Sequence, residues 1–444
     1  MLLSKRKRYL TGSDWVINTL DHMMKAQTRA GNMSQIVLLF DAPVDEQEVS
    51  AGLNRFLKQF PVLEGCVARD CKLTPYWAIP KQCGRDVQIA VHHVDDASSW
   101  QALQPYLEKS VNRPFRDKKD HLAFELFTSP GKSALSMTFD HRIFDARGAE
   151  MLLNLFQQHL TNGGGPVSGD ITFGSSMALT GWSKKFLAGR NVNRRIIALS
   201  KSTPTALPVP DGAGRCHRYH RLWFSEQETA ALYERAYQEA GYLMESSYLL
   251  SVIIRSMHQL FKSRNIDSNS YLIPVTLDLR PNKDPLQEIF FNYVSYLFYQ
   301  IPASEVVDRK GLIVLLKQQM FDQVKSGFPK DLAEASLLTR IAPLPVLGKL
   351  LPIPMKGKMA TFAFSHLGKS SYQHPLFMGR KVAELFHMPR VPVPPGLGFF
   401  SNYYNGRLNL VISYLDGLLT GDELRMLEQQ IRSGFGLETA AGRR

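Results

Sequence analysis

The same pattern, a strand followed by a capped helix, occurs twice in the chain, and this repeat restricts the possible folds more than any other feature of the sequence. Residues 34–61 begin with the apolar run SQIVLLF, continue with Asp45 and Glu48 at capping-box spacing, and then place apolar residues at helical intervals. Residues 218–241 repeat this order, with Ser225 followed three residues later by a glutamate. A strand followed by a capped helix, once in each half, predicts two similar lobes that contain both strands and helices.

The length of the chain agrees with two lobes. A chain of 444 residues is longer than one ordinary hydrophobic core accommodates. Between the two repeated units, residues 161–169 and 200–214 are rich in Gly, Pro, Ser and Thr, as loops and linkers are. We therefore predict a first lobe over residues 1–185, a linker or crossover over 186–215, and a second lobe over 216–444.

The second half contains further regular patterns. The predicted elements are a long helix around 243–263, strands at 271–281 and 290–302, a hairpin at 399–415 that turns at Asn405-Gly406, and a capped final helix at 420–431. Together with the repeated units, this mixture gives an α/β fold with an α+β sandwich in each lobe.

The charge balance favours acidic partners. The chain has 53 Lys and Arg against 40 Asp and Glu, a net charge of +13, which attracts nucleic acid, anionic lipid, phosphorylated cofactors or acidic carrier proteins. The densest basic segment, 182–201, mixes cations with apolar residues, so we expect a basic amphipathic helix on the surface. Nucleic-acid binding would require cations interleaved with aromatic residues on one face, whereas the cationic stretches here are separate and mainly aliphatic. We therefore expect no nucleic-acid partner.

Cysteine and histidine spacing predicts neither disulfides nor a metal site. Four cysteines in 444 residues form no disulfide framework, and their spacing matches no common zinc pattern. His217 and His220 lie close to Cys216 but lack further clustered ligands, so we expect no bound metal. The sequence also lacks a dinucleotide-binding glycine pattern, a Walker loop and a serine-hydrolase elbow.

No segment has the pattern of a targeting signal or a membrane span. The first two leucines are followed at once by charges, so we expect no signal peptide. The apolar stretch 337–355 is interrupted by Arg340, Lys349 and several prolines, which excludes a span. We expect a cytoplasmic protein. Two alternatives stay open for residues 337–358: a lid or membrane-touching flap, or a buried loop between helix and strand.

The most informative histidine is His141, which lies where an alternating strand stops. In the segment KSALSMTFDH apolar and polar residues alternate strictly, and His141 continues the apolar parity, so it should point inward. A helical pattern begins near Gly148. An inward histidine is more often a hydrogen-bonded core residue than a base. Asp145, four residues on, is however placed to hold the loop or to pair with a cation, which would fix the imidazole.

Four segments resemble those of one known superfamily. Residues 141–145, HRIFD, resemble the His-x-x-x-Asp-Gly motif of chloramphenicol-acetyltransferase-like enzymes, with Asp140 where many condensation relatives have a first histidine and Ala146 in place of the glycine. The other three matching segments, in the same order as in the family, are 34–65, VTLDLRP at 275–281 and TFAFSHLGK at 361–369. The chain thus resembles stand-alone relatives of peptide-synthetase condensation domains and polyketide-associated or wax-ester-type acyltransferases.

The resemblance implies a fold and a site. It implies two pseudo-similar lobes with the active site in a tunnel between them, and His141 as the general base. It implies a structural role for Asp145, paired across the two halves with Arg280 of the DLRP segment. It also implies that Ser365 and Asn292 contribute to an oxyanion site or line the tunnel. No metal and no permanently bound cofactor are implied.

The activity that the resemblance implies is acyl transfer. The donor would be a thioester, on coenzyme A or on the phosphopantetheine of an acyl carrier protein, and the acceptor a hydroxyl or amine of a small molecule or lipid. The attack would need no covalent enzyme intermediate, and the positive charge suits either donor. We expect a monomer, with membrane-surface contact if the acceptor is a lipid. A non-catalytic, condensation-like scaffold that binds a partner is the alternative.

Overall fold

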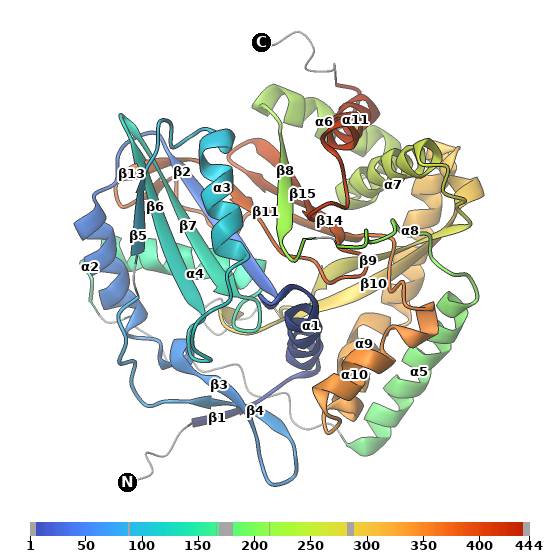
Figure 1. Cartoon of the computed structure of the whole chain (residues 1–444), viewed down its shortest axis with the longest axis horizontal. Coiled ribbons are helices and arrows are strands. Elements are labelled where there is room, and N and C mark those ends of the chain that lie inside the picture. Colours follow the sequence, from blue (N-terminus) through green and yellow to red (C-terminus); the bar gives the residue numbers. More distant parts are fainter. Residues whose placement is uncertain are drawn as a thin grey trace.

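The structure, a computed structural model, contains two six-stranded sheets that lie next to each other and one small sheet below them (Figure 1). It describes residues 6–87, 89–165, 167, 181–212, 214–281 and 288–437. The small sheet has the order β1-β4-β3, with β1 at Arg6–Tyr9, β3 at Cys66–Arg69 and β4 at Pro75–Ile79. The two-lobed α/β architecture is the one that the sequence predicted.

The first large sheet has the order β12-β13-β2-β7-β6-β5. Its strands are β2 (Met33–Phe40), β5 (Ile89–His93), β6 (Leu122–Ser129), β7 (Lys132–Asp140), β12 (Leu376–Phe377) and β13 (Arg380–His387). Helices α2 (Glu46–Leu57) and α4 (Ala146–Thr161) pack on one face, and α3 (Trp100–Val111) packs on the other. Both faces of the sheet are therefore covered, which places its central strands in the core.

The second large sheet has the order β10-β9-β11-β14-β15-β8. Its strands are β8 (His217–Trp223), β9 (Ser270–Asp278), β10 (Val294–Pro302), β11 (Ala363–Lys369), β14 (Leu397–Tyr404) and β15 (Arg407–Leu415). The helices whose apolar residues join its core are α6 (Glu226–Ala240), α7 (Glu245–Ser263), α8 (Arg309–Lys325) and α11 (Gly421–Gly434). The sheet is mixed, because β11 runs parallel to both β9 and β14.

The remaining helices lie below the two large sheets, from the junction of the lobes to the outer edge of the molecule (Figure 1). These are α1 (Gly12–Thr28), α5 (Trp182–Ser200), α9 (Phe328–Ser336) and α10 (Leu344–Leu350), with short 3₁₀ turns at η1 (Pro61–Glu64), η3 (Ala303–Val306), η4 (Leu337–Thr339) and η5 (Ile353–Met355). In Figure 1, α1 lies between the two sheets, and α5, α9 and α10 form the lower right of the molecule.

The two repeated units fold as predicted. At Asp45 the carboxylate accepts the N–H of Glu48, and helix α2 follows. At Ser225 both bonds of the capping box are present, and α6 ends at Gly241, whose φ is +95°. The predicted hairpin turns at Asn405-Gly406 with φ of +47° and +79°, the left-handed conformation that this dipeptide tolerates best.

The second half of the chain supplies a strand pair to the first sheet. Strand β13 comes from the second half of the chain, yet it pairs antiparallel with β2 of the first sheet and extends that sheet together with β12. In addition, α5, which occupies the first half of the predicted linker 186–215, is a regular helix that packs against α9, η4 and η5. The predicted lobe boundaries 1–185 and 216–444 stay a prediction, but the first lobe is not continuous in sequence.

Burial in two segments is decided by tertiary packing. In β7 apolar and polar residues alternate, and both faces of the strand are buried, because α3 covers the polar one and Gln35 hydrogen-bonds Thr138 there. Residues 337–358 are not a buried loop, since most of their side chains are exposed around α10 and the turns beside it. Among the helices that the structure describes, none is long and apolar enough to cross a membrane.

Candidate functional site

His141 lies where the two halves of the chain meet. It follows the last residue of β7, and its backbone N–H donates to the carbonyl of Asn32 at 2.9 Å. Close by, Phe144 and Phe291 form an isolated parallel bridge between the turn after β7 and the segment before β10. The imidazole is partly exposed. A histidine at a strand end, at a lobe junction and open to solvent, is positioned as a reactive group would be.

Asn292 holds the imidazole of His141 in one orientation. The Nδ2 amide group of Asn292 donates to the backbone carbonyl of His141 at 2.9 Å and to that of Arg142 at 3.3 Å. Because carbonyl oxygens accept only, this fixes which end of the amide faces the ring. Oδ1 of Asn292 then lies 3.2 Å from Nδ1 of His141, so Nδ1 is the protonated nitrogen of the neutral ring. The lone pair is left on Nε2.

Asn292 is in turn held by Asp14. Its backbone N–H donates to Oδ1 of Asp14 at 3.1 Å, and Oδ2 of Asp14 accepts from Nη1 of Arg8 at 2.7 Å. Asp14 also caps helix α1 through Thr11. All of these groups except Thr11 are buried. The N-terminal helix therefore takes part in positioning the His141 imidazole, a link that no motif in the sequence indicated.

Asp145 and Arg280 form the predicted pair across the two halves. Nη2 of Arg280 donates to Oδ1 of Asp145 at 2.5 Å, and both side chains are almost fully buried. Burial would raise the pKa of Asp145, but the Arg280 guanidinium and the N–H groups of Gly148 and Tyr293 hold it below its usual value. Burial would likewise lower the pKa of Arg280, yet the carboxylates beside it raise it. The described bonds of Asp145 go to the N–H groups of Gly148 and Tyr293 and to Arg280, and none goes to the imidazole.

Gly148 is required where α4 approaches the segment before β10. A Cβ atom at this position would lie 2.1 Å from the carbonyl oxygen of Ile289. Asp145 is the N-cap of α4 and accepts the N–H of Gly148, so the helix begins at Ala146, two residues earlier than the sequence indicated. The alanine in the place of the motif's glycine is thus the first helical residue, and Gly148 provides the close contact.

Asp140 supports the same turn from its other side. Its carboxylate accepts from Nε and Nη2 of Arg142 and lies 3.1 Å from Nδ1 of His121. Burial would raise the pKa of Asp140, but Arg142 and His121 hold it well below its usual value. Nε2 of His121 lies 2.8 Å from the carbonyl oxygen of Gly65. Asp140, which replaces the first histidine of many relatives, is therefore a buried structural carboxylate here.

A second set of contacts joins α4 to the second sheet. Nε of Arg147 lies 3.1 Å from Asp278 at the end of β9, and Asp278 also accepts from Arg280. Nη2 of Arg147 donates to the carbonyl of Leu367 on β11 at 2.6 Å. Together with Asp145, these residues form a continuous chain of charges from the first lobe to the second.

Ser365 lies on β11 within the second sheet. Its Oγ atom is 2.6 Å from Oγ1 of Thr276, and its neighbour His366 has Nδ1 2.9 Å from Oγ of Ser401. Burial, with the charge of Arg147, lowers the pKa of His366 to about 4. Within the described residues no hydrogen bond joins Ser365 to His141 or Asn292. The structure thus brings His141 and Asn292 together, and it leaves Ser365 outside that group.

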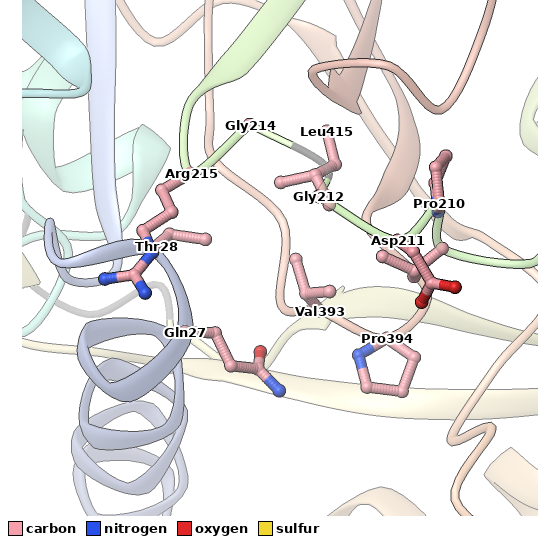
Figure 2. Close-up of a pocket in the computed structure, with 11 residues that line it drawn as sticks. Gln27, Thr28, Pro210, Asp211, Gly212, Gly214, Arg215, Val393, Pro394 and Leu415 are labelled. Atoms are coloured by element: carbon pink, nitrogen blue, oxygen red, sulfur yellow. The ribbon is translucent and has the colours of Figure 1, made fainter.

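An open cavity of about 490 Å³ lies at the C-terminal end of α1 (Figure 2). Gln27 and Thr28 of α1 form one side, and the loops around Asp211 and Pro394 face them. Arg215 reaches across toward Thr28. His141 is not among its lining residues, although the helix leads within four residues to Asn32, which binds the His141 backbone. The described residues contain no cluster of three or more His, Cys, Asp or Glu that could hold a metal ion.

Comparison with known proteins identifies the fold. No family model matches the sequence, and no curated protein is significantly similar to it. Solved structures are similar along almost the whole chain. A trichothecene 15-O-acetyltransferase from Fusarium sporotrichioides covers 97% of this chain and 95% of its own at 13% identity, with a TM-score of 0.71.

Two further structures are similar in the same way. The first condensation domain of the calcium-dependent antibiotic synthetase covers 97% of this chain and 96% of its own at 12% identity, with a TM-score of 0.69. Polyketide synthase associated protein 5 from Mycobacterium tuberculosis covers 94% and 97% at 14% identity, with a TM-score of 0.59. The chain therefore has the two-lobed fold of condensation domains and acyltransferases of this type, as the sequence predicted.

Proposed function

We propose that the protein transfers an acyl group from a thioester to a hydroxyl or amine, with His141 as the general base. The observation that supports this most directly is the tautomer imposed by Asn292, because it leaves the lone pair of Nε2 available to accept a proton. The amide that orients this ring comes from the segment before β10, in the second half of the chain, whereas the partly exposed ring follows β7 in the first half. The fold shared with an acetyltransferase and condensation domains supports the same reaction class.

The reaction we propose is a direct transfer. The acceptor's O–H or N–H gives its proton to Nε2 of His141 while its oxygen or nitrogen attacks the thioester carbonyl. The tetrahedral intermediate then collapses, the carbon–sulfur bond breaks, and the imidazolium returns the proton to the departing thiolate. The products are an ester or amide and a free thiol. Asn292 accepts from Nδ1–H throughout, so it also stabilises the imidazolium that forms.

The partners follow from this reaction. The donor is acyl-coenzyme A or an acyl carrier protein, both anionic and both suited to a chain with a net charge of +13. The acceptor is a small molecule or lipid with a hydroxyl or amine. We assign Asp145 and Arg280 to holding the loop, and Asn292 to positioning the base. We propose no catalytic role for Ser365, whose hydroxyl bonds to Thr276 within the second sheet.

The experiment that tests this function measures free-thiol release. The protein is incubated with a panel of acyl-coenzyme A donors and acyl carrier proteins, each with pooled alcohol and amine acceptors. We expect release that needs an acceptor and that falls by at least about 10²-fold in the His141→Ala variant. His93→Ala is the matched control, because this histidine is exposed at the end of β5, where its Nδ1 atom lies 2.8 Å from Oγ1 of Thr128.

Two outcomes would contradict the proposal. Turnover that is unchanged in His141→Ala would remove the assigned base. No release with any donor, from a protein whose melting curve shows that it is folded, would favour the alternative of a non-catalytic scaffold that binds a partner.

A further inference from the structure

Two neighbouring segments present large apolar side chains to solvent. On α5, the exposed residues are Trp182, Phe186, Leu187 and Ile197. In the segment around α10 they are Ile341, Val346, Leu350, Leu351 and Ile353. Each of these nine side chains is between 46% and 63% exposed. A single exposed apolar residue needs no explanation, but a cluster of this kind on adjacent elements marks an interaction site.

The two segments lie along each other. Gly189 of α5 approaches Leu338, whose Cδ1 atom would lie 2.8 Å from an added Cβ. Further along the helix, Leu199 packs with Met355 of η5. Both segments lie at the lower right of Figure 1. We call the exposed side chains of residues 182–201 and 340–358 the basic apolar surface.

The exposed residues of α5 form one face of the helix. Trp182, Phe186, Arg190, Arg194 and Ile197 follow each other at intervals of three or four residues, and all are exposed. The opposite face is already occupied, since its buried residues include Lys185, Ala188, Val192 and Leu199. The outer face is therefore free for a partner, and its apolar and basic residues are mixed.

The charges of the basic apolar surface all have the same sign. Residues 182–201 and 340–358 contain no Asp or Glu. Their exposed cations are Lys184, Arg190, Arg194 and Lys201 on the first segment and Lys349, Lys356 and Lys358 on the second. Carboxylates of α9, Asp331 and Glu334, lie near the inner face of α5, but no ion pair between residues that the structure describes includes any of these seven exposed cations. The surface is therefore complementary to a partner of negative charge.

We propose that the basic apolar surface binds the face of a membrane that contains anionic lipids. Trp182 and Phe186 are residues that insert at the level of the headgroups, and lysines and arginines beside them bind lipid phosphates. Exposed leucines and isoleucines supply the apolar area that a purely electrostatic partner would not need. None of the described helices can cross a membrane, so binding is to the surface only.

The experiment uses the full chain and vesicles of defined lipid. The protein is sedimented with vesicles of phosphatidylcholine alone and with vesicles that also contain phosphatidylglycerol. We expect binding to the second kind only, weakened as the salt concentration rises. Intrinsic tryptophan fluorescence should shift to shorter wavelength on binding, and this shift should disappear in Trp182→Phe, because Trp15 and Trp77 are buried in the core and Trp100 and Trp223 lie outside the basic apolar surface.

Variants separate the two parts of the surface. Phe186→Ser and Leu350→Ser should each weaken vesicle binding about tenfold, and Arg190→Glu with Arg194→Glu by a similar or larger factor. Tyr242→Ser and Lys118→Glu are the controls, because both residues are exposed outside the surface. Since all the altered side chains are exposed, melting temperatures should not change.

Three results would overturn the proposal. These are no binding to vesicles of either composition, equal loss of binding in the control variants, and a concentration-dependent dimer that Phe186→Ser disperses, which would assign the surface to a second copy of the chain. His141→Ala should bind vesicles normally, so the proposal stands or falls apart from the proposed activity.

Discussion

At the scale of single residues, the feature of greatest consequence is the amide of Asn292. It uses both of its ends at once: Nδ2 holds the backbone of the turn, and Oδ1 holds the ring of His141. The backbone of the turn after β7 and the imidazole ring of His141 are therefore held in one relative orientation. Asp145, by contrast, makes no bond to the ring: its bonds go to Gly148 of α4 and to Tyr293 and Arg280 of the second half of the chain.

We predict that Asn292→Ala lowers kcat about 10- to 100-fold with little change in KM. The ring loses its partner and the proton on Nδ1 is no longer favoured, while the surfaces that bind substrate remain. Steady-state thiol release measures both constants. Asn193→Ala, on the exposed face of α5, is the matched control and should leave both unchanged. A normal kcat in Asn292→Ala would show that the orientation of the ring does not depend on this amide.

A second prediction at this scale concerns His217, whose side chain is fully buried. Burial, reinforced by the charge of Arg390, lowers the pKa of His217 to about 3. The unfolded chain takes up this proton below a pH of about 6.5, whereas the folded protein does not, so acid favours the unfolded state. The free energy of unfolding should therefore fall by about 1.4 kcal/mol for each pH unit below that point through this group.

The His217→Gln variant isolates this effect. Between pH 7 and pH 5 the native protein should lose about 2 kcal/mol more stability than the variant, as measured by urea unfolding at each pH. Equal losses in the two proteins would mean that His217 is protonated in the folded state.

At the scale of elements, the turn from β7 to α4 depends on a charge pair from two lobes. Asp145 caps α4 and is bound to Arg280 beyond the end of β9. Both side chains are buried, so the loss of one partner leaves a charge without compensation. The pKa of Asp145 is lowered, which means that its contribution is present above the ordinary carboxyl pKa and is lost as acid protonates the group.

We predict that Arg280→Met lowers the free energy of unfolding at pH 7 by about 3 to 5 kcal/mol. Urea unfolding measures the change. Arg425→Met removes an ion pair that is exposed on α11 and should cost at most about 0.5 kcal/mol. The double variant Asp145→Asn with Arg280→Met should be less destabilised than Arg280→Met alone, because no charge is then left buried. A double variant as unstable as the sum of the single ones would count against a direct pair.

At the scale of the whole molecule, the two lobes are joined by shared strands as well as by the surfaces that pack together. Strands β12 and β13 complete the first sheet although they belong to the second half of the chain. Without them, the edge of β2 would be exposed over residues 36–40, and all eight residues of β2 are buried in the intact protein. The first sheet is therefore complete only with strands from both halves of the chain.

We predict that residues 1–212 expressed alone do not form a stable monomer. The unpaired edge of β2 should lead to aggregation or partial unfolding, visible by size-exclusion chromatography and circular dichroism. Co-expression with residues 214–444 should restore a soluble complex. The intact protein should unfold in one transition. Two separate transitions, or a stable first half on its own, would show that the first lobe does not need β12 and β13 in order to fold.

Local signals in the sequence determined much of what this protein is. Three features follow from the spacing of apolar residues, from helix caps and from turn residues: the capped strand–helix units, the Asn405-Gly406 hairpin and the basic helix at 182–201. These signals depend only on neighbours a few residues away. The His141 motif and its pairing with Arg280 came from a pattern of the same local kind together with the resemblance to a family.

The tertiary structure decided the rest, because the contacts involved lie far apart in the chain. Asn292 is 151 residues from His141 and Asp14 is 278 residues from Asn292, so no period or spacing could bring them together. The same holds for β13, whose apolar pattern cannot state which sheet it joins. The tertiary structure also determines which side chains of α5 and of the segment around α10 are exposed, because exposure depends on what the rest of the chain covers.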